Sequence, residues 1–265
     1  MDGGLVHASE EGTPQGSPVS PLLSNIMLDG LDWELDKRGH RFVRYADDGR
    51  IYVRSERAGQ RVMASITQYV EQCLKLRVNR QKSAVAPAVE RPLLGLEFFR
   101  DKAGKVRVTV ASKALRRAEG RIRRLTARRW GVSMERRIRE INRFTVGWTA
   151  YFQLADTALP FQRLDKWLRR RLRQVRWKEW KRQPTRYRNL RALGIQARDA
   201  REWAASHKGY WRLAGSWPLQ VGLPNAYWHE TMGLHGFLDA YRRFRDAKRT
   251  AWCGPACQVV WEEPG

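Results

Sequence analysis

Acidic residues, cysteines and long apolar runs are all scarce in this chain of 265 residues. Asp and Glu number 27 against 51 Lys and Arg, which gives a net charge of +24. Three cysteines, Cys73, Cys253 and Cys257, are too few for a disulfide framework and favour a reducing compartment. The longest stretch without a charged residue, Leu213–His229, contains two prolines and is shorter than the ~20 apolar residues that cross a membrane. The composition therefore excludes a disulfide-stapled secreted domain and a membrane-spanning protein.

The pair Cys253 and Cys257 has a spacing that a metal site could use, but no second pair of Cys or His residues follows it. A structural zinc ion takes four ligands. We therefore expect unpaired thiols at these two positions.

The positive charge is concentrated in one part of the chain. Residues 112–191 contain 25 Lys and Arg against 6 Asp and Glu, a net charge of +19. Arginine predominates there, and its planar guanidinium suits bidentate phosphate contacts and stacking on bases. A solvated helical face could also be basic, but so much unbalanced charge would repel itself without a polyanion. We therefore expect a nucleic-acid partner. The predicted contacts are Arg116, Arg117, Arg123, Arg124, Arg128, Arg169, Arg170 and Arg173.

Two adjacent aspartates, Asp47 and Asp48, lie between two runs of alternating apolar residues, 42–45 and 51–53. This pattern predicts a β-hairpin with both carboxylates at its tip. Carboxylate oxygens are the ligands that Mg²⁺ prefers, and metal ions held there could steady the attacking and leaving oxygens of phosphoryl transfer. The alternative is an ordinary solvated turn, because Asp-Gly is common in hairpin loops.

A loop with three prolines and two glycines, residues 12–21, precedes an apolar segment that begins at Leu22. Proline fixes φ, whereas glycine adopts φ values that other residues disfavour, so the loop is expected to be irregular but stiff. Such a loop at a helix start offers backbone amides to a phosphate or a sugar. The alternative is an ordinary helix N-terminus with Ser and Pro in the first turn.

In this order and at this distance the two segments resemble the motifs of reverse transcriptases, specifically of the group II intron-encoded reverse transcriptase/maturase family. Residues 12–26 resemble motif B, and Tyr45–Asp48 resembles the metal-binding motif C. Residues 76–83 are similar to motif D, and Leu93–Phe98 to the primer-grip motif E. Gly147–Phe152 resembles the signature of the maturase (thumb) domain, so the likeness covers nearly the whole chain.

The resemblance implies an RNA-directed DNA polymerase that copies RNA into DNA and assists the splicing and mobility of an intron. By that likeness Asp47 and Asp48 would be catalytic ligands of Mg²⁺, the implied cofactor, and Lys82 would neutralise or protonate the leaving pyrophosphate. The implied partners are intron and template RNA, a DNA primer or target, and deoxynucleoside triphosphates, in a bacterial cytoplasm at RNA or the nucleoid. The implied contacts with template, primer and incoming nucleotide are Tyr45, Pro14, Gln15, Gly16, Leu94 and Gly95.

The family's fingers and its motif A aspartate are expected upstream, because motif B begins about ten residues after Met1. Two adjacent aspartates should hold two metal ions weakly without a further carboxylate. We therefore expect an N-terminally truncated polymerase that is inactive alone, unless a separate chain supplies the missing segment. An alternative is an RNA-binding maturase without polymerase activity. A DNA-binding regulator is disfavoured, because the sequence has no helix-turn-helix or zinc-finger spacing.

The order of elements predicts an α+β fold. It would be an incomplete polymerase palm, with an antiparallel sheet covered by helices on one face, followed by an α-helical thumb bundle and a small helical C-terminal module. The predicted domains are residues 1–100, 101–192 and 193–265. The elements expected before the bundle are helices over 19–38 and 57–76, a hairpin over 41–54, and strands near 84–86, 93–99 and 106–110.

Three apolar stripes at helical spacing predict the bundle, with apolar faces inward and arginines outward. The stripes begin at Ala114, Met134 and Phe161. Ser112, just before the first stripe, is the expected N-cap of its helix. Farther along, residues 208–212 resemble the segment that follows the thumb in family members, where contact with target DNA is expected.

Overall fold

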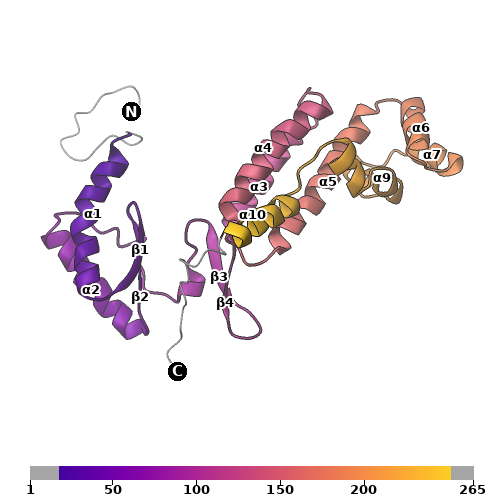
Figure 1. Ribbon diagram of the computed structural model, residues 1–265. Helices are drawn as coiled ribbons and strands as arrows, with labels where there is room; N and C mark the ends of the chain where they lie inside the picture. The colour runs from indigo at the N-terminus through magenta and orange to yellow at the C-terminus, as the bar shows by residue number, and fades with distance from the viewer. Residues whose placement is uncertain (1–17, 252–265) are drawn as a thin grey trace, which may run out of the picture. The chain divides into compact units, whose positions relative to one another are not determined.

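The computed structural model describes residues 18–251, and the side chains of residues 18–247. The chain divides into two compact units, residues 1–91 and 92–265, which we call unit 1 and unit 2. Helices and small antiparallel sheets occur together (Figure 1), so the predicted α+β class is confirmed. Among residues 18–251 no helix is long and apolar enough to cross a membrane.

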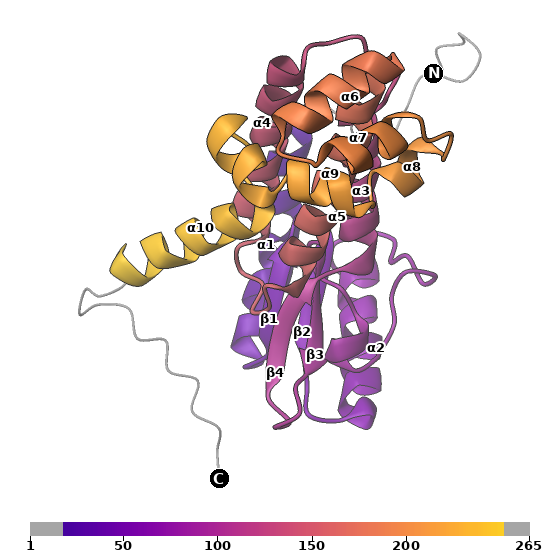
Figure 2. The ribbon, with the colours of Figure 1, turned by 90° about the vertical axis from the view of Figure 1, so that its right-hand side faces the viewer.

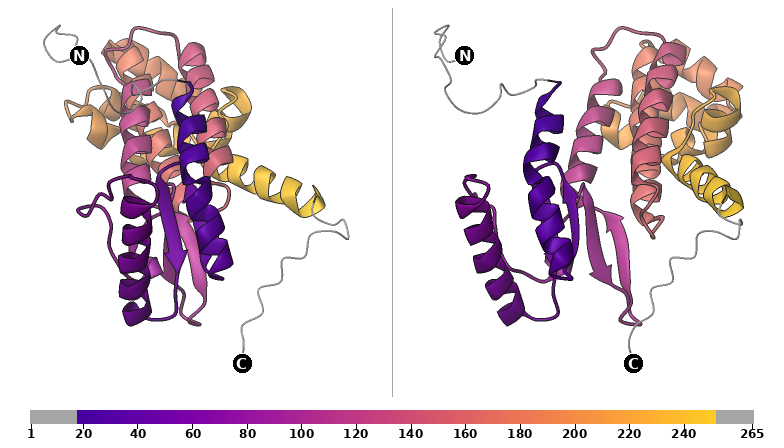
Figure 3. Two further views of the ribbon diagram at one scale, coloured as in Figure 1. Left: turned by 90° about the vertical axis from the view of Figure 1, so that its left-hand side faces the viewer. Right: turned by 60° about the vertical axis from the view of Figure 1, so that its left-hand side comes forward.

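Residues 18–91 of unit 1 form two α-helices and one hairpin (Figure 3), close to the predicted ranges. Its elements are α1 (Ser20–Lys37), β1 (Arg41–Tyr45), β2 (Asp48–Tyr52), α2 (Glu56–Gln72) and a short 3₁₀ turn at Ala88–Glu90. The antiparallel register pairs Arg41 with Tyr52 and Tyr45 with Asp48, which confirms the predicted hairpin. Ser55 caps α2, because its side chain accepts a hydrogen bond from the amide of Ala58.

The strand predicted near 84–86 is wrong. Within the described part of unit 1 the only ladder is β1–β2, and residues 83–87 run without a strand partner. Val85 instead packs on α2, because a side chain added at Gly59 would meet Val85 Cγ1 at 2.5 Å. The apolar character of this segment therefore reflects contact with a helix, which a short run of residues does not distinguish from contact with a sheet.

Little of unit 1 is buried. Of its described apolar side chains only Leu35 and Val70 are buried, with 3% and 8% exposure. Several apolar side chains of α1 are exposed. They are Leu22, Leu23, Ile26, Met27 and Trp33, and Val19 just before the helix is exposed as well. Unit 1 thus lacks a packed core of its own in the residues that the structure describes.

Unit 2 is mainly helical (Figure 2). Its elements are β3 (Leu96–Arg100), β4 (Val106–Val110), α3 (Ser112–Leu125), α4 (Met134–Phe152), α5 (Leu159–Glu179), α6 (Gln183–Ala192), α7 (Ala197–Ala204), α8 (Tyr210–Leu213), α9 (Trp217–Gly222), a π turn at Tyr227–Thr231 and α10 (Phe237–Ala251). Here β3 and β4 pair only with each other, from Leu96 opposite Val110 to Arg100 opposite Val106. The described strands therefore form two separate hairpins rather than the single sheet that we predicted, because each strand finds its partner across a short local turn.

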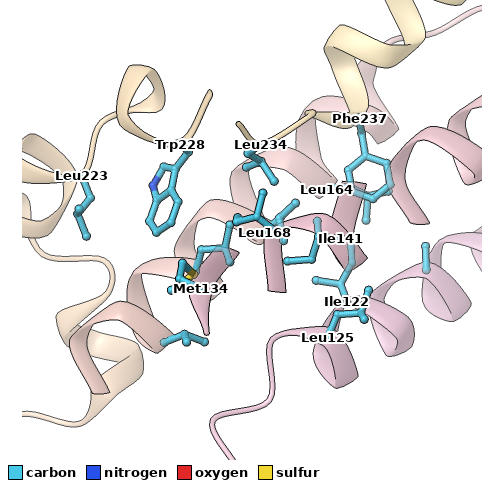
Figure 4. Packing of buried hydrophobic residues seen from close by; sticks show 14 of the residues in the cluster. Ile122, Leu125, Met134, Ile141, Leu164, Leu168, Leu223, Trp228, Leu234 and Phe237 are labelled. Atoms are coloured by element: carbon cyan, nitrogen blue, oxygen red, sulfur yellow. The ribbon is translucent and has the colours of Figure 1, made fainter. Parts of the chain in front are cut away.

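The three predicted apolar stripes all lie in the core of unit 2. Ile122 on α3, Ile141 on α4 and Leu168 on α5 are each fully buried (Figure 4). The same core continues into the C-terminal segment through Trp228 and Phe237, which are also fully buried. One continuous cluster thus joins the helical bundle to the segment that follows it.

Two details of the predicted bundle are wrong. Ser112 is the first residue of α3, and Ala111 occupies the N-cap position without a side-chain cap. The amide of Ser112 donates to a carboxylate oxygen of Glu97 on β3 instead, at 3.1 Å. The arginines are also not all outside, because Arg137 is only 1% exposed. The two terminal nitrogens of its guanidinium donate to main-chain carbonyls rather than to a carboxylate.

The C-terminal helix α10 is capped by a residue that is distant in the sequence. The carboxylate of Asp165 on α5 accepts from the amides of Phe237 at 2.7 Å and Leu238 at 2.9 Å. Burial raises the pKa of Asp165, and the two amide hydrogen bonds oppose that effect. A side chain at Gly236 would meet an oxygen of Asp165 at 3.1 Å, so the cap packs tightly against this glycine. This contact fixes α10 on α5.

The difference in burial predicts a difference in hydrogen exchange. Amides of α1 and α2 should exchange at least about a hundredfold faster than the core amides of α3, α4 and α5, because local stability follows buried apolar contact. Exchange measured by mass spectrometry on the monomeric chain tests this. Equal protection of the two sets of helices would show that unit 1 is stabilised by something other than its own described core.

Candidate functional site

The two predicted carboxylates lie at the tip of the β1–β2 hairpin. Tyr45 ends β1 and pairs with Asp48, the first residue of β2, so that Ala46 and Asp47 form a two-residue loop. Ala46 adopts a φ of 52°, a conformation that non-glycine residues rarely take. Gly49 lies in the ladder opposite Arg44 rather than in the loop. Asp47 and Asp48 are both exposed, so the hairpin presents two adjacent carboxylates to solvent.

Arg44 fixes this loop to α1. Its guanidinium forms a bidentate ion pair with Asp32 on α1, with Nε at 2.8 Å from Oδ1. It also donates to Asn25 on α1 and to the carbonyl of Ala46, each at 3.0 Å. The hydrogen bond with Asp32 raises the pKa of Arg44, which stays cationic. One side chain thus connects α1 to the backbone of the Asp47 loop.

The ligand chemistry of the loop fits a hard divalent cation. Both side chains offer carboxylate oxygens, which are the ligands that such a cation prefers. Asp48 also forms an ion pair with Arg50 on the same strand, with Oδ1 at 3.4 Å from Nε. Within the described residues no group of three Asp, Glu, His or Cys side chains is placed to hold a metal ion.

For the remaining predicted site residues of unit 1, the described part of the chain shows no contact with the two aspartates. Lys82 lies in a turn that Asn79 stabilises, since the side chain of Asn79 accepts from the Lys82 amide at 3.2 Å. The Lys82 side chain is exposed, and no contact joins it to the aspartates in the described residues. Pro14, Gln15 and Gly16 lie outside the described residues, as do Cys253 and Cys257.

Leu94 and Gly95, the predicted primer-grip residues, form a tight turn in unit 2. Both have positive φ, 51° and 79°, and Leu93 and Leu96 exchange two backbone hydrogen bonds across them. The hydroxyl of Tyr151 at the end of α4 donates to the carbonyl of Leu94 at 3.1 Å. A side chain at Gly95 would meet the ring of Phe152 at 3.2 Å. The predicted maturase signature and the predicted primer grip are therefore in contact.

The predicted nucleic-acid arginines fall into two groups. Five are exposed: Arg116, Arg117, Arg123, Arg124 and Arg128. The three on α5 are only partly exposed, and two of them hold the C-terminal segment. Arg170 donates to the carbonyl of Trp211 at 3.1 Å, and Arg173 to that of Ala214 at 3.0 Å. Burial and then the neighbouring arginines lower the pKa of Arg173 to about 10.

Sequence reasoning missed the two arginines that organise these regions, Arg44 and Arg137. A signal for each was present. Arg44 occupies the inward position of the alternating strand after Phe42, and Arg137 lies on the apolar stripe between Met134 and Ile141. A charged residue at an inward position indicates a buried hydrogen-bond partner.

Comparison with known proteins adds two family matches and one relative. Residues 3–98 match the family described as reverse transcriptase (RNA-dependent DNA polymerase). Residues 115–194 match the group II intron, maturase-specific domain. The chain is also 29% identical over 119 residues to "Protein YkfC" of Escherichia coli (strain K12). That alignment covers 32% of this chain and 31% of the relative, so the chain spans under a third of the relative's length.

Removal of Arg44 should loosen the Asp47 loop. Arg44→Ala breaks hydrogen bonds from a charged donor, each worth about 1.5–3 kcal/mol when protected and less at this partly exposed site. We expect the amides of residues 46–48 to exchange about tenfold faster, measured by nuclear magnetic resonance. Arg54→Ala, a change at an exposed arginine just after β2, is the control and should have no such effect. Equal exchange in both variants would contradict the assigned role of Arg44.

A comparison of Gly95 with Gly104 distinguishes the cost of backbone strain from the cost of packing at the Leu94–Gly95 turn, because the two glycines have the same φ. Gly95 and Gly104 both have a φ of 79°, but only a side chain at Gly95 would meet another residue within 4 Å. Each change to alanine should cost about 1 kcal/mol of strain. Gly95→Ala should cost roughly 1 kcal/mol more, because the Phe152 ring must move. Chemical denaturation followed by tryptophan fluorescence measures both. Equal losses would mean that the turn does not pack on α4 in solution.

Proposed function

Because the chain belongs to the group II intron reverse transcriptase/maturase family, we propose that it is part of an RNA-directed DNA polymerase that also assists intron splicing and mobility. The observation that carries this proposal is the hairpin loop with Asp47 and Asp48. It lies within the residues that match the reverse transcriptase family, and Arg44 fixes it to α1. Exposed adjacent carboxylates on a fixed turn are part of what a metal-dependent nucleotidyl transfer requires of a protein.

The proposed reaction joins a deoxynucleotide to a primer 3′-OH with release of pyrophosphate. Asp47 and Asp48 would hold Mg²⁺, which when bound supplies positive charge beside the transferring phosphoryl group. Arg44 contributes indirectly, because its hydrogen bonds keep both carboxylates at one position relative to α1. Tyr45 is exposed at the end of β1 and would lie against a template–primer.

The other polymerase roles are proposed on family likeness together with position. Lys82 is exposed on a turn, free to carry its ammonium group to a pyrophosphate. Leu94 and Gly95 would contact the primer from the tight turn that they form, by family likeness. Pro14, Gln15 and Gly16 would contact the incoming nucleotide. A further carboxylate would come from a fingers and palm segment, upstream or in a separate chain.

Unit 2 is proposed to bind intron RNA and the copied DNA. Its support is the net charge of +19 over residues 112–191 together with the exposure of five of the predicted arginines. Phosphate contacts from such a surface give affinity with little sequence information. The same charge would keep the protein at RNA or the nucleoid of a bacterial cytoplasm.

Loss of either aspartate should abolish nucleotide incorporation. We expect Asp47→Asn and Asp48→Asn to reduce primer extension on an RNA template by about a hundredfold or more, since metal-ion charge stabilisation supplies several kcal/mol. The assay uses the chain supplemented with the fingers and palm segment of a family member. The control is Asp36→Asn, which removes an exposed carboxylate from α1 and should leave extension unchanged.

Binding of Mn²⁺, a paramagnetic substitute for Mg²⁺, gives a second measurement on the 265-residue chain alone. The amide signals of residues 45–50 should broaden in wild type and in Asp36→Asn but not in Asp47→Asn. Primer extension that persists in Asp47→Asn would contradict the metal assignment. Equal broadening in Asp47→Asn and wild type would contradict it as well.

A further inference from the structure

A second arginine, Arg50, lies beside the carboxylates at the tip of the β1–β2 hairpin. Arg50 and Asp48 are two residues apart on β2, and alternate residues of a strand point to the same face of a hairpin. The ion pair between them, with Nε at 3.4 Å from Oδ1, agrees with that placement. Arg50 therefore reaches the Asp48 carboxylate along one face of the hairpin.

Arg44 reaches the same loop from the opposite face. It lies opposite Gly49 in the ladder, and Gly49 is the residue between Asp48 and Arg50. Because neighbouring positions of a strand point to opposite faces, the two arginines lie on different sides of the hairpin. Arg44 donates to the carbonyl of Ala46 and so holds the backbone of the loop. Arg50 pairs instead with a side chain that is proposed to bind metal.

The ion pair between Arg50 and Asp48 is weak enough to open. The side chain of Arg50 is 28% exposed and that of Asp48 is 53% exposed. A pair with this much contact with water contributes little to stability, so its opening leaves the fold intact. The charge of Arg50 remains when the pair opens, because a guanidinium does not lose its proton at physiological pH.

This charge opposes the binding of a divalent cation at the loop. A cation that takes Oδ1 of Asp48 as a ligand displaces the guanidinium and then lies close to a like charge. A divalent and a univalent cation about 6 Å apart in water repel each other by enough to lower a binding constant about tenfold, and salt reduces the effect. Two carboxylates neutralise one divalent ion, so the occupied loop with Arg50 beside it carries an excess of one positive charge.

We propose that Arg50 competes with the metal ion for Asp48, and that it makes the loop select a metal–triphosphate complex over the free metal ion. This rests on the proposed function in one respect, that Asp47 and Asp48 bind Mg²⁺. Phosphate groups that enter together with the cation cancel the excess positive charge. Their oxygens also accept hydrogen bonds from the guanidinium that leaves Asp48. Arg50 is thus a specificity-determining residue of the site.

The test is the broadening of the amide signals of residues 45–50 by Mn²⁺, measured by nuclear magnetic resonance on the 265-residue chain. Two probes are titrated, Mn²⁺ alone and its one-to-one complex with tripolyphosphate. Arg50→Gln should bind Mn²⁺ alone about three- to tenfold more tightly than wild type, because the repulsion is removed. It should bind the complex about threefold or more weakly, because the phosphates lose a charged hydrogen-bond donor.

Two variants separate the charge of Arg50 from other causes. Arg54→Gln is the charge-matched control, because Arg54 is exposed just after β2 and lies four residues beyond Arg50. That is roughly 13 Å along an extended strand, which is longer than the screening length at physiological salt. Arg54→Gln should bind both probes as wild type does. Arg50→Lys keeps the charge, so for Mn²⁺ alone it should stay closer to wild type than to Arg50→Gln. A dispersed amide spectrum checks that each variant is folded.

Equal affinity of Arg50→Gln and wild type for Mn²⁺ alone would overturn the competition. An equal gain in Arg54→Gln or in Arg50→Lys would overturn it as well, because the charge at position 50 would then not be the cause. A gain of Arg50→Gln for the tripolyphosphate complex as large as its gain for the free ion would overturn the selectivity. Absence of broadening in wild type and in every variant would instead refute the metal assignment itself, and with it the role of Arg50.

Discussion

The hydrogen bonds from Arg137 to the end of α3 are the interaction on which unit 2 depends. The last carbonyls of a helix have no partner within the helix and carry partial negative charge. Arg137 reaches them from α4 and is itself almost fully buried. Burial lowers its pKa, but a guanidinium stays charged at any physiological pH. The terminal nitrogens of the guanidinium therefore supply hydrogen-bond donors to the end of α3 and to the loop after it.

This arrangement explains how a chain so rich in arginine packs without many acids. Arg171 and Lys178 donate from α5 to neighbouring carbonyls of the same segment, those of Thr126 and Arg128, and Arg173 donates to the carbonyl of Ala214. Peptide oxygens thus take the place of carboxylates as the partners of buried cations. The total charge of the chain is therefore larger than the charge available to bind a polyanion, because several arginines stabilise the fold instead.

Periodic patterns in the sequence predicted the parts of the fold that periodic burial produces. Alternation located the β1–β2 hairpin, and the stripes from Ala114, Met134 and Phe161 located the three helices. The errors share a different cause. Strand 84–86, the Ser112 cap and the outward arginines all failed because a side chain or backbone group met a distant partner, which local spacing does not reveal. The candidate site shows the same division, since the pattern located Asp47 and Asp48 at the end of a hairpin but gave no position for Arg44.

Arg44 and Arg137 act by the same physical means in the two units, although the surroundings differ. Each occupies an inward position of a regular element and donates through its planar fork to the carbonyl of a chain reversal, at Ala46 and at Leu125. In unit 2 a large apolar core supports that contact. In unit 1 only two described apolar side chains are buried, so the ion pair of Arg44 with Asp32 must do more of the positioning. A partly exposed ion pair is weakened by salt and by the loss of either partner. The geometry of the two carboxylates therefore depends on a local polar contact rather than on the packing of the unit. A protein segment that covered α1 would strengthen that contact, because it would exclude water from the ion pair.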